Sequence, residues 1–220
     1  KSIGICTFQG CSSLQQLIIP PFVTSIGIGA FDGCSSLTQI KLPSSLTIIE
    51  ECTFNDCFSL QSIIIPPSVE EIKDYAFKNC KSLGLISIPS SIVRFGNGIF
   101  DGVVSLEIFG NIYCIPWNLF NNNSTLNNLV INSSLLYIKE RSFEGCSSLS
   151  NVSLPSSLQS IEPYSFKGCI SLKTVLIPTK SSLNSIGNCA FEGCYSLVDI
   201  SIPSTTSIGD GCFNGCSLLS

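Results

Sequence analysis

Thiols are the side chains with the widest chemistry in this sequence, which has 13 cysteines and no histidine among 220 residues. A deprotonated cysteine can bind a metal, form a disulfide or act as a nucleophile. Without histidine, however, the chain has no Cys-His or Ser-His pair and no imidazole ligand. No Cys-x-x-Cys pair occurs, and an odd number of thiols cannot all pair with one another. The role of the cysteines must therefore be sought in their positions along the chain.

Most of the cysteines share one position in a repeat. Phenylalanine recurs about every 23 residues, at positions 8, 31, 54, 77, 100, 120, 143, 166, 191 and 213. In eight of these ten copies the third residue after it is a cysteine: Cys11, Cys34, Cys57, Cys80, Cys146, Cys169, Cys194 and Cys216. Val103 and Asn123 fill the other two copies. A free cysteine packs like a small apolar side chain, and stacked strands about 4.8 Å apart hold parallel side chains slightly too far apart for easy disulfides. The pattern favours a reduced structural cysteine ladder over disulfides or a metal site.

Each repeat also contains an expected strand. The sixth residue after the phenylalanine is always leucine, and the ninth and eleventh are apolar in nearly every copy, as in Leu37, Ile40 and Leu42. This alternation predicts a short strand of which every second side chain points into a core. Proline follows in most copies and ends the strand, because proline cannot donate to a ladder. A second apolar pair, as in Val23 and Ile26, is expected to close the core from the opposite wall.

The segment around each phenylalanine is expected to be a helical turn. The second residue after it is glycine in seven copies and Asp56, Asn79 or Asn122 in the others. These residue types enter the left-handed backbone region at least cost, so the turn is predicted to end there in a left-handed cap. Three more thiols precede the phenylalanine by two residues and are expected to be more exposed than the ladder, namely Cys6, Cys52 and Cys189.

The repeat resembles a known family. The stretches FDGCSSLTQIKLPSSL (31–46) and FEGCSSLSNVSLPSSL (143–158) are similar to the BspA-like leucine-rich repeat, also called treponemal-type or LRR_5. The resemblance covers nearly the whole chain. It implies a right-handed, curved leucine-rich repeat solenoid, with short parallel strands on the concave face and turns and short helical turns on the convex side. Similar proteins occur on the surfaces of bacteria and of anaerobic protist parasites, where they act as adhesins, and others lack secretion signals. A composition rich in Asn, Ile and Ser is more typical of a protist than of a bacterium.

Residues 1–220 are expected to form a single array of about ten units. Both ends fall in the middle of a repeat, so the chain is expected to be a fragment of a longer protein. One segment, 101–130, is irregular: GNIYCIPWNLFNNNST replaces the usual strand ending, and the ladder cysteine is missing twice. One interpretation is an eroded repeat that bends the solenoid. The other is a loop specialised for a ligand, with Tyr113 and Trp117 as aromatic anchors.

The concave face is where we expect partner binding. If the ninth and eleventh residues after the phenylalanine point inward, the eighth and tenth point outward. They combine neutral polar side chains with aliphatic ones, and the expected partner-binding residues are Ile18, Lys41, Ile64, Leu85, Val130, Leu176 and Asp199. Ile108 is expected to point outward in the same way. The aliphatic residues either favour strand formation alone or form an extended, low-charge face for a protein partner.

The low charge of the chain limits the kinds of partner that it can bind. The net charge is −4, only 12% of the residues are charged, and no Lys/Arg cluster occurs, which argues against nucleic acid or an anionic membrane surface as the partner. One repeat apart, Glu50 is expected beside Lys73, and Lys139 beside Glu162. No apolar run approaches the ~20 residues that span a bilayer, so no membrane insertion is expected within this fragment.

We therefore expect a non-enzymatic protein-binding repeat module with no cofactor and no metal. The favoured interpretation is a cell-surface adhesion or host-interaction domain, at the cell surface or outside the cell, with a protein ligand that the sequence does not identify. The alternative is an intracellular protein-protein interaction scaffold, whose thiols stay reduced. A secretion signal or anchor in the full gene would favour the first.

Overall fold

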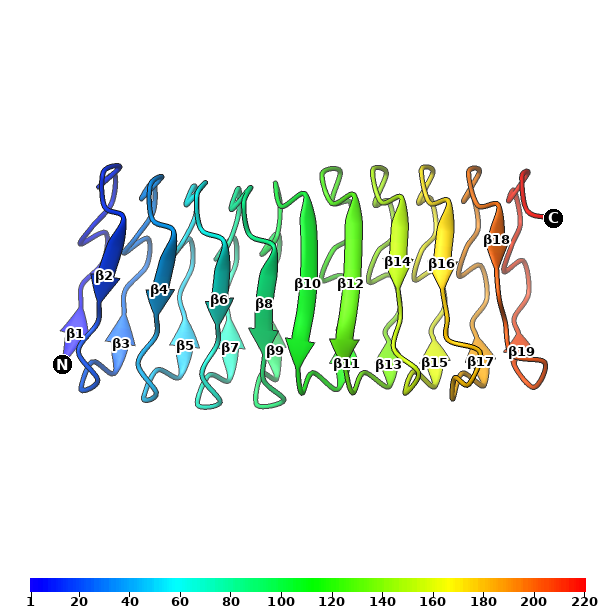
Figure 1. The fold of residues 1–220 in the computed structure, drawn as a ribbon, viewed down its shortest axis with the longest axis horizontal. Coiled ribbons are helices and arrows are strands. Elements are labelled where there is room, and N and C mark those ends of the chain that lie inside the picture. The colour runs from blue at the N-terminus through cyan, green and yellow to red at the C-terminus, as the bar shows by residue number, and fades with distance from the viewer. The chain divides into compact units, whose positions relative to one another are not determined.

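The computed structural model describes the backbone of residues 1–220 and every side chain except that of Ser133. The chain forms two compact units, residues 1–106 and 107–220. In each unit, successive repeats add one parallel strand after another to the same sheets (Figure 1). The division falls within β10 (Ser105–Gly110), inside the irregular segment 101–130.

Both units have two walls of parallel strands. We call the wall with the longer strands the strand face and the other the opposite wall. The strand face contains β2 (Gln16–Ile18), β4 (Gln39–Lys41), β6 (Ser62–Ile64) and β8 (Leu85–Ile88) in the first unit, and β12 (Asn128–Ser133), β14 (Asn151–Ser153), β16 (Thr174–Leu176) and β18 (Asp199–Ile200) in the second. The opposite wall contains β1 (Ser2–Ile3), β3 (Ser25–Ile26), β5 (Ile48–Ile49), β7 (Glu71–Ile72) and β9 (Arg94–Phe95), and in the second unit β11 (Cys114–Ile115), β13 (Tyr137–Ile138), β15 (Ser160–Ile161), β17 (Ser185–Ile186) and β19 (Ser207–Ile208). Each strand residue lies opposite the equivalent residue of the next repeat, as Val152 lies opposite Val175.

The predicted solenoid of short parallel strands is confirmed, but the predicted helical turns are wrong. The segments around the phenylalanines consist of hydrogen-bonded turns, and no helix occurs among the described residues. The reason lies in the N–H groups, which alternate between two kinds of acceptor. Cys34 donates within its own turn, to Phe31 O at 3.1 Å, whereas Phe31 donates to Thr53 O of the next repeat at 3.0 Å. In an α-helix the N–H groups donate to carbonyl oxygens of the same helix. Because every second N–H here donates to the next repeat, these segments cannot form a helix.

Phenylalanine rings form the centre of the core. Phe31, Phe54 and Phe77 are fully buried, and their ring centroids follow one another at 5.4 and 5.5 Å with interplanar angles of 2° and 3°. In the second unit, Phe143 and Phe166 stack at 4.9 Å. Each ring therefore replaces solvent contact with contact to the rings of the neighbouring repeats.

The cysteine ladder lies beside these rings, and all 13 cysteines of the chain are free. Cys57 is fully buried, and its Sγ donates to the carbonyl of Phe31 at 3.2 Å. That carbonyl already accepts the N–H of Cys34, so the thiol is a second donor to the same oxygen. The ladder thiols at the first and last repeats, Cys11 and Cys216, are exposed and half-buried respectively. Valine can fill the same space, as Val103 does, but it has no proton to donate.

One outward-pointing prediction is contradicted. Ile108 is fully buried and Phe109 is half-buried, the reverse of the expectation. Elsewhere the strand begins two residues after the buried leucine, as β4 does after Leu37. In the irregular repeat, β10 begins at Ser105, before Leu106. The alternation therefore starts at Leu106 and buries Ile108 instead of Phe109.

The left-handed backbone predicted after each phenylalanine is present, as at Gly33 with φ 72° and Asn79 with φ 58°. A second left-handed position was not predicted. It lies two residues before each phenylalanine, and most copies lack glycine there: Cys6, Cys52, Tyr75, Asn118, Arg141, Tyr164 and Cys189 have φ between 51° and 59°. Side chains with a Cβ are strained in this region.

Replacing Cys52 by glycine is expected to relieve this strain. The Cys52→Gly variant should be more stable than Cys52→Ala by about 1 kcal/mol, because alanine keeps the Cβ that clashes in the left-handed region. Both variants remove the same thiol, so the comparison isolates the backbone effect. Urea unfolding of the two variants measures the difference. Equal stability would mean that the left-handed conformation of Cys52 is unstrained.

Candidate functional site

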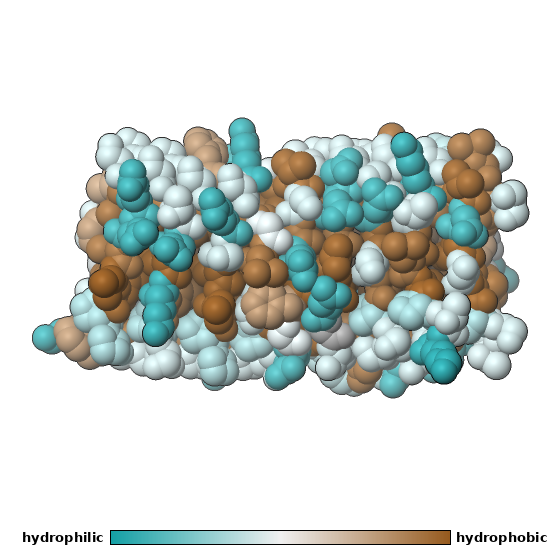
Figure 2. Space-filling model, in the orientation of Figure 1, coloured by the Kyte–Doolittle hydropathy of each residue, from teal (hydrophilic) through white to brown (hydrophobic). Residues whose placement is uncertain are grey.

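The strand face exposes aliphatic side chains. Ile18 is 91% exposed, Ile64 69% and Leu176 61%. Lys41, Leu85 and Asp199 are exposed on the same face, whereas Val130 is half-buried. Figure 2 shows apolar side chains over the strands of this face, with polar ones among and beside them. Exposed aliphatic side chains that lie together, rather than singly, are typical of an interaction surface.

In the first unit this face has an open hollow of about 530 Å³, which we call the first hollow. Three neighbouring strands line it, and the register places Ile18 opposite Lys41. The lining residues are Gln16, Leu17, Ile18, Gln39, Ile40, Lys41, Leu42, Ser44, Ser62, Ile63, Ile64 and Pro66. The predicted binding residues Ile18, Lys41 and Ile64 therefore lie in one place.

The second unit has a smaller hollow of about 220 Å³ on its own strand face, which we call the second hollow. It brings together Leu176 and Asp199, and its remaining lining residues are Ser153, Thr174, Val175, Ile177, Pro178 and Ser201. Leu85 and Val130 line neither hollow. The charge in this hollow is negative, opposite to that in the first.

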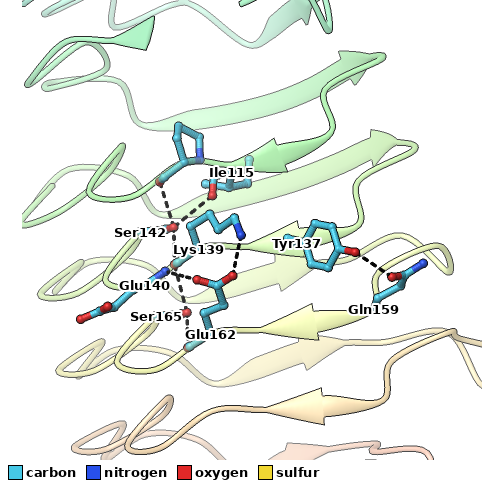
Figure 3. A network of polar contacts seen from close by, with 9 residues as sticks. Ile115, Tyr137, Lys139, Glu140, Ser142, Gln159, Glu162 and Ser165 are labelled. Carbon is cyan, nitrogen blue, oxygen red and sulfur yellow. Dashed lines mark hydrogen bonds and ion pairs between the residues drawn. The ribbon is translucent and has the colours of Figure 1, made fainter. Parts of the chain in front are cut away.

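The polar groups of the opposite wall bind one another. Lys139 Nζ and Glu162 Oε1 form an ion pair at 2.7 Å (Figure 3), and the hydrogen bond to Glu162 raises the pKa of Lys139. The hydroxyl of the buried Ser142 has one proton to donate, and two carbonyl oxygens lie within reach of it: that of Lys139 at 2.6 Å and that of Pro116, one repeat away, at 3.0 Å. Tyr137 donates to Gln159 one repeat away at 3.0 Å. These contacts join successive repeats and leave the hydroxyls engaged as hydrogen-bond donors.

The two aromatic residues of the irregular segment do not join the strand face. Trp117 and Tyr113 are 64% and 55% exposed, and they flank β11, a strand of the opposite wall. The ring of Tyr113 lies 5.4 Å from that of Tyr137, and the hydrogen bond with Tyr137 raises the pKa of Tyr113. The sequence offered two candidate binding surfaces, the strand face and the irregular segment with its two aromatic residues. In the second unit these two surfaces therefore lie on different walls.

Sequence reasoning named only part of the first hollow. Gln16, Gln39 and Ser62 line it beside the expected residues, and they occupy the outward position eight residues after each phenylalanine. The alternation predicted that this row points outward, but the expected partner-binding residues did not include these three. Within the described part of the chain, no group of three or more His, Cys, Asp or Glu is arranged to hold a metal, and no described helix could cross a membrane.

Known proteins that resemble this chain support the repeat found in its sequence. Among solved structures, a leucine rich cell surface protein from Faecalibacterium prausnitzii is 26% identical, with a TM-score of 0.51, over 100% of this chain and 68% of that one. A leucine-rich repeat protein from Eubacterium ventriosum is 22% identical, with a TM-score of 0.54, over 98% of this chain and 80% of that one, and shows the fold alone. No curated protein matches the chain. The sequence pattern of the BspA type Leucine rich repeat region matches residues 1–112 and 113–220, in six copies. The chain therefore belongs to the BspA-type leucine-rich repeat family.

Proposed function

We propose that this chain is a protein-binding module of a cell-surface adhesion protein and that its strand face binds a host or matrix protein. The observation that supports this most is the row of exposed aliphatic side chains, above all Ile18 and Ile64, around the first hollow. An isoleucine left in water gains about 1.5–3 kcal/mol when a partner fully covers it. A face of this kind is suited to a partner surface rather than to solvent.

The family and one structural relative support the choice of partner and location. Proteins built of stacked repeats commonly bind other proteins along their strand surfaces. The relative from Faecalibacterium prausnitzii is named as a cell surface protein. A surface location like that of this relative, together with the low charge of the strand face, supports the proposal of adhesion by contact with a protein.

An intracellular scaffold is the second candidate, and one observation favours it. All 13 cysteines are free, including the exposed Cys6 and Cys11. Disulfides persist in oxidising compartments, and free thiols are typical of the reducing cytosol. In this interpretation the same strand face organises cytoplasmic proteins.

Antibody labelling of source cells separates the two candidates. Serum raised against residues 1–220 is applied to intact cells and to permeabilised cells, with serum against a cytoplasmic protein as the control. Labelling of intact cells is the expected result. Labelling only after permeabilisation would overturn the adhesion proposal and favour the scaffold.

A further inference from the structure

Lys41 lies between two exposed isoleucines in the first hollow. The register pairs Ile18 with Lys41 across β2 and β4, and Gln39 with Ser62 across β4 and β6. Ile64 follows Ser62 by two residues and is therefore level with Lys41. Adjacent strands are about 4.8 Å apart, so these three side chains form an apolar, cationic, apolar row about 10 Å long.

The ammonium group of Lys41 differs from most cations of the chain. Ion pairs hold Lys73, Arg94, Lys139, Arg141 and Lys167. Aromatic rings hold Lys1, Lys78 and Lys81. Lys41 is exposed and, among the side chains that the structure describes, has neither an ion pair nor an aromatic ring beneath it. It is also the one charged residue among those that line the first hollow. The hollow therefore offers an uncompensated positive charge between apolar walls.

A second row runs beside the first. It consists of Gln16, Gln39 and Ser62 and lines the same hollow. Each of these residues lies two positions before a residue of the first row, about 7 Å away along its strand. Their amides and hydroxyl provide both donors and acceptors. A polypeptide backbone has N–H and C=O groups that need such partners when they leave water. This row suits a peptide better than a purely apolar ligand.

We propose that the first hollow binds an extended peptide segment in which one acidic residue is flanked by large aliphatic residues. The carboxylate pairs with Lys41, the aliphatic side chains pack against Ile18 and Ile64, and the peptide backbone bonds to the glutamine row. Only every second side chain of an extended chain points to the same side, about 6.6 Å from the next, so the acidic residue and the aliphatic residues two positions to either side of it can face the row together. The inference rests on the proposed function, because it names the chemistry of the partner for the same face.

The second hollow provides an internal comparison. It also combines an exposed aliphatic residue, Leu176, with one charged residue, but that residue is the exposed Asp199. A carboxylate repels an acidic peptide, so this hollow is not the site for the same segment.

The test measures fluorescence anisotropy with three labelled peptides that differ only at the centre. Each has leucines two residues before and two residues after a central residue, with Gly/Ser at the other positions, and the central residue is glutamate, glutamine or lysine. The wild-type protein should bind the glutamate peptide about two- to five-fold more tightly than the glutamine peptide, as an exposed ion pair provides. High salt should reduce the difference. Lys41→Gln should abolish the preference, and Lys41→Glu should transfer it to the lysine peptide.

A matched control keeps the result specific to Lys41. Lys173 is exposed just before β16 and lies outside both hollows, so Lys173→Gln should retain the preference for glutamate. Both positions are at the surface, and urea unfolding checks that each variant folds. Equal binding of the three peptides by the wild type, or a preference that survives Lys41→Gln, would overturn the proposal.

Dimerisation of the chain through the first hollow would have a different signature. If sedimentation shows that the free protein is a dimer and that Ile18→Ser makes it monomeric, the occupant of the hollow is a second copy and the peptide proposal is wrong. If intact cells are labelled but the three peptides bind equally, the carboxylate assignment fails while the adhesion proposal stands. If only permeabilised cells are labelled but the protein still prefers the glutamate peptide, the adhesion proposal fails while the carboxylate assignment stands.

Discussion

The Phe54→Ala variant is expected to lose about 3–5 kcal/mol of stability, the range for removing a fully buried aromatic side chain. Phe54 stacks between Phe31 and Phe77 at 5.4 and 5.5 Å. Alanine leaves a cavity between two rings whose positions are fixed by their own turns. Since each repeat is stabilised by its neighbours, the loss weakens contacts on both sides. Urea unfolding followed by circular dichroism measures the change.

Phe58 is the matched control for this prediction. It lies four residues later in the same repeat but is 40% exposed, and the ammonium of Lys81 lies over its ring. Phe58→Ala should cost about 1 kcal/mol or less, because little apolar surface leaves the core. Similar losses for the two variants would show that the phenylalanine stack does not hold the repeats together.

Raising the pH from about 8 to 10.5 is expected to destabilise the protein steeply through its buried thiols. Burial raises the pKa of Cys34 to about 11 and raises the pKa values of Cys57 and Cys80 as well. In the unfolded chain these thiols ionise near pH 8.5. The folded state holds their protons longer, so its advantage is complete below that pH and is lost as the pH rises. Each thiol contributes a slope of up to about 1.4 kcal/mol per pH unit.

A variant with two ladder thiols replaced isolates this effect from the titration of lysine and tyrosine. Cys57→Val with Cys80→Val keeps apolar side chains of similar size, as Val103 does in its own repeat. The variant should lose up to about 2.7 kcal/mol per pH unit of the wild-type slope between pH 9 and 10.5. Measurement requires urea midpoints at several pH values. An unchanged slope would show that the ladder thiols do not titrate in the unfolding transition.

Residues that repeat at a constant position were predictable, because stacking places each one beside its own copy. The ion pair of Lys73 with Glu50, one repeat apart at 2.7 Å, follows from spacing alone. The buried strand positions follow from the same argument, and so does the left-handed backbone after each phenylalanine, where Gly, Asn and Asp mark the site. For these features, the sequence of one repeat is enough to predict the structure of the others.

Features that depend on bonding between repeats were not predictable from one repeat. The turns fail to become helices because half of their N–H groups donate to the next repeat. The left-handed position at Cys52 and Arg141 was hidden, because neither residue type marks positive φ. Ile108 was misplaced because the strand of the irregular repeat already includes its leucine, Leu106, which shifts the alternation by one residue.

The proposed binding face was predicted as a row of outward-pointing residues but not as a hollow. The alternation identifies Ile18, Lys41 and Ile64 as outward-pointing side chains, which the structure shows on three adjacent strands. The depth of the hollow depends on how far the side chains on neighbouring strands extend. That property belongs to the packed surface, and no single strand contains it.

Binding to matrix proteins and host cells tests the adhesion proposal most directly. Wild-type protein, the double variant Ile18→Ser with Ile64→Ser, and Trp117→Ala are compared on purified extracellular-matrix proteins and on intact host cells. We predict that the double variant loses at least about ten-fold in affinity, since two exposed isoleucines no longer pack against the partner. Trp117→Ala, on the opposite wall, should bind as the wild type does. Binding that survives the double variant but is lost in Trp117→Ala would contradict the account and place the site at the irregular segment.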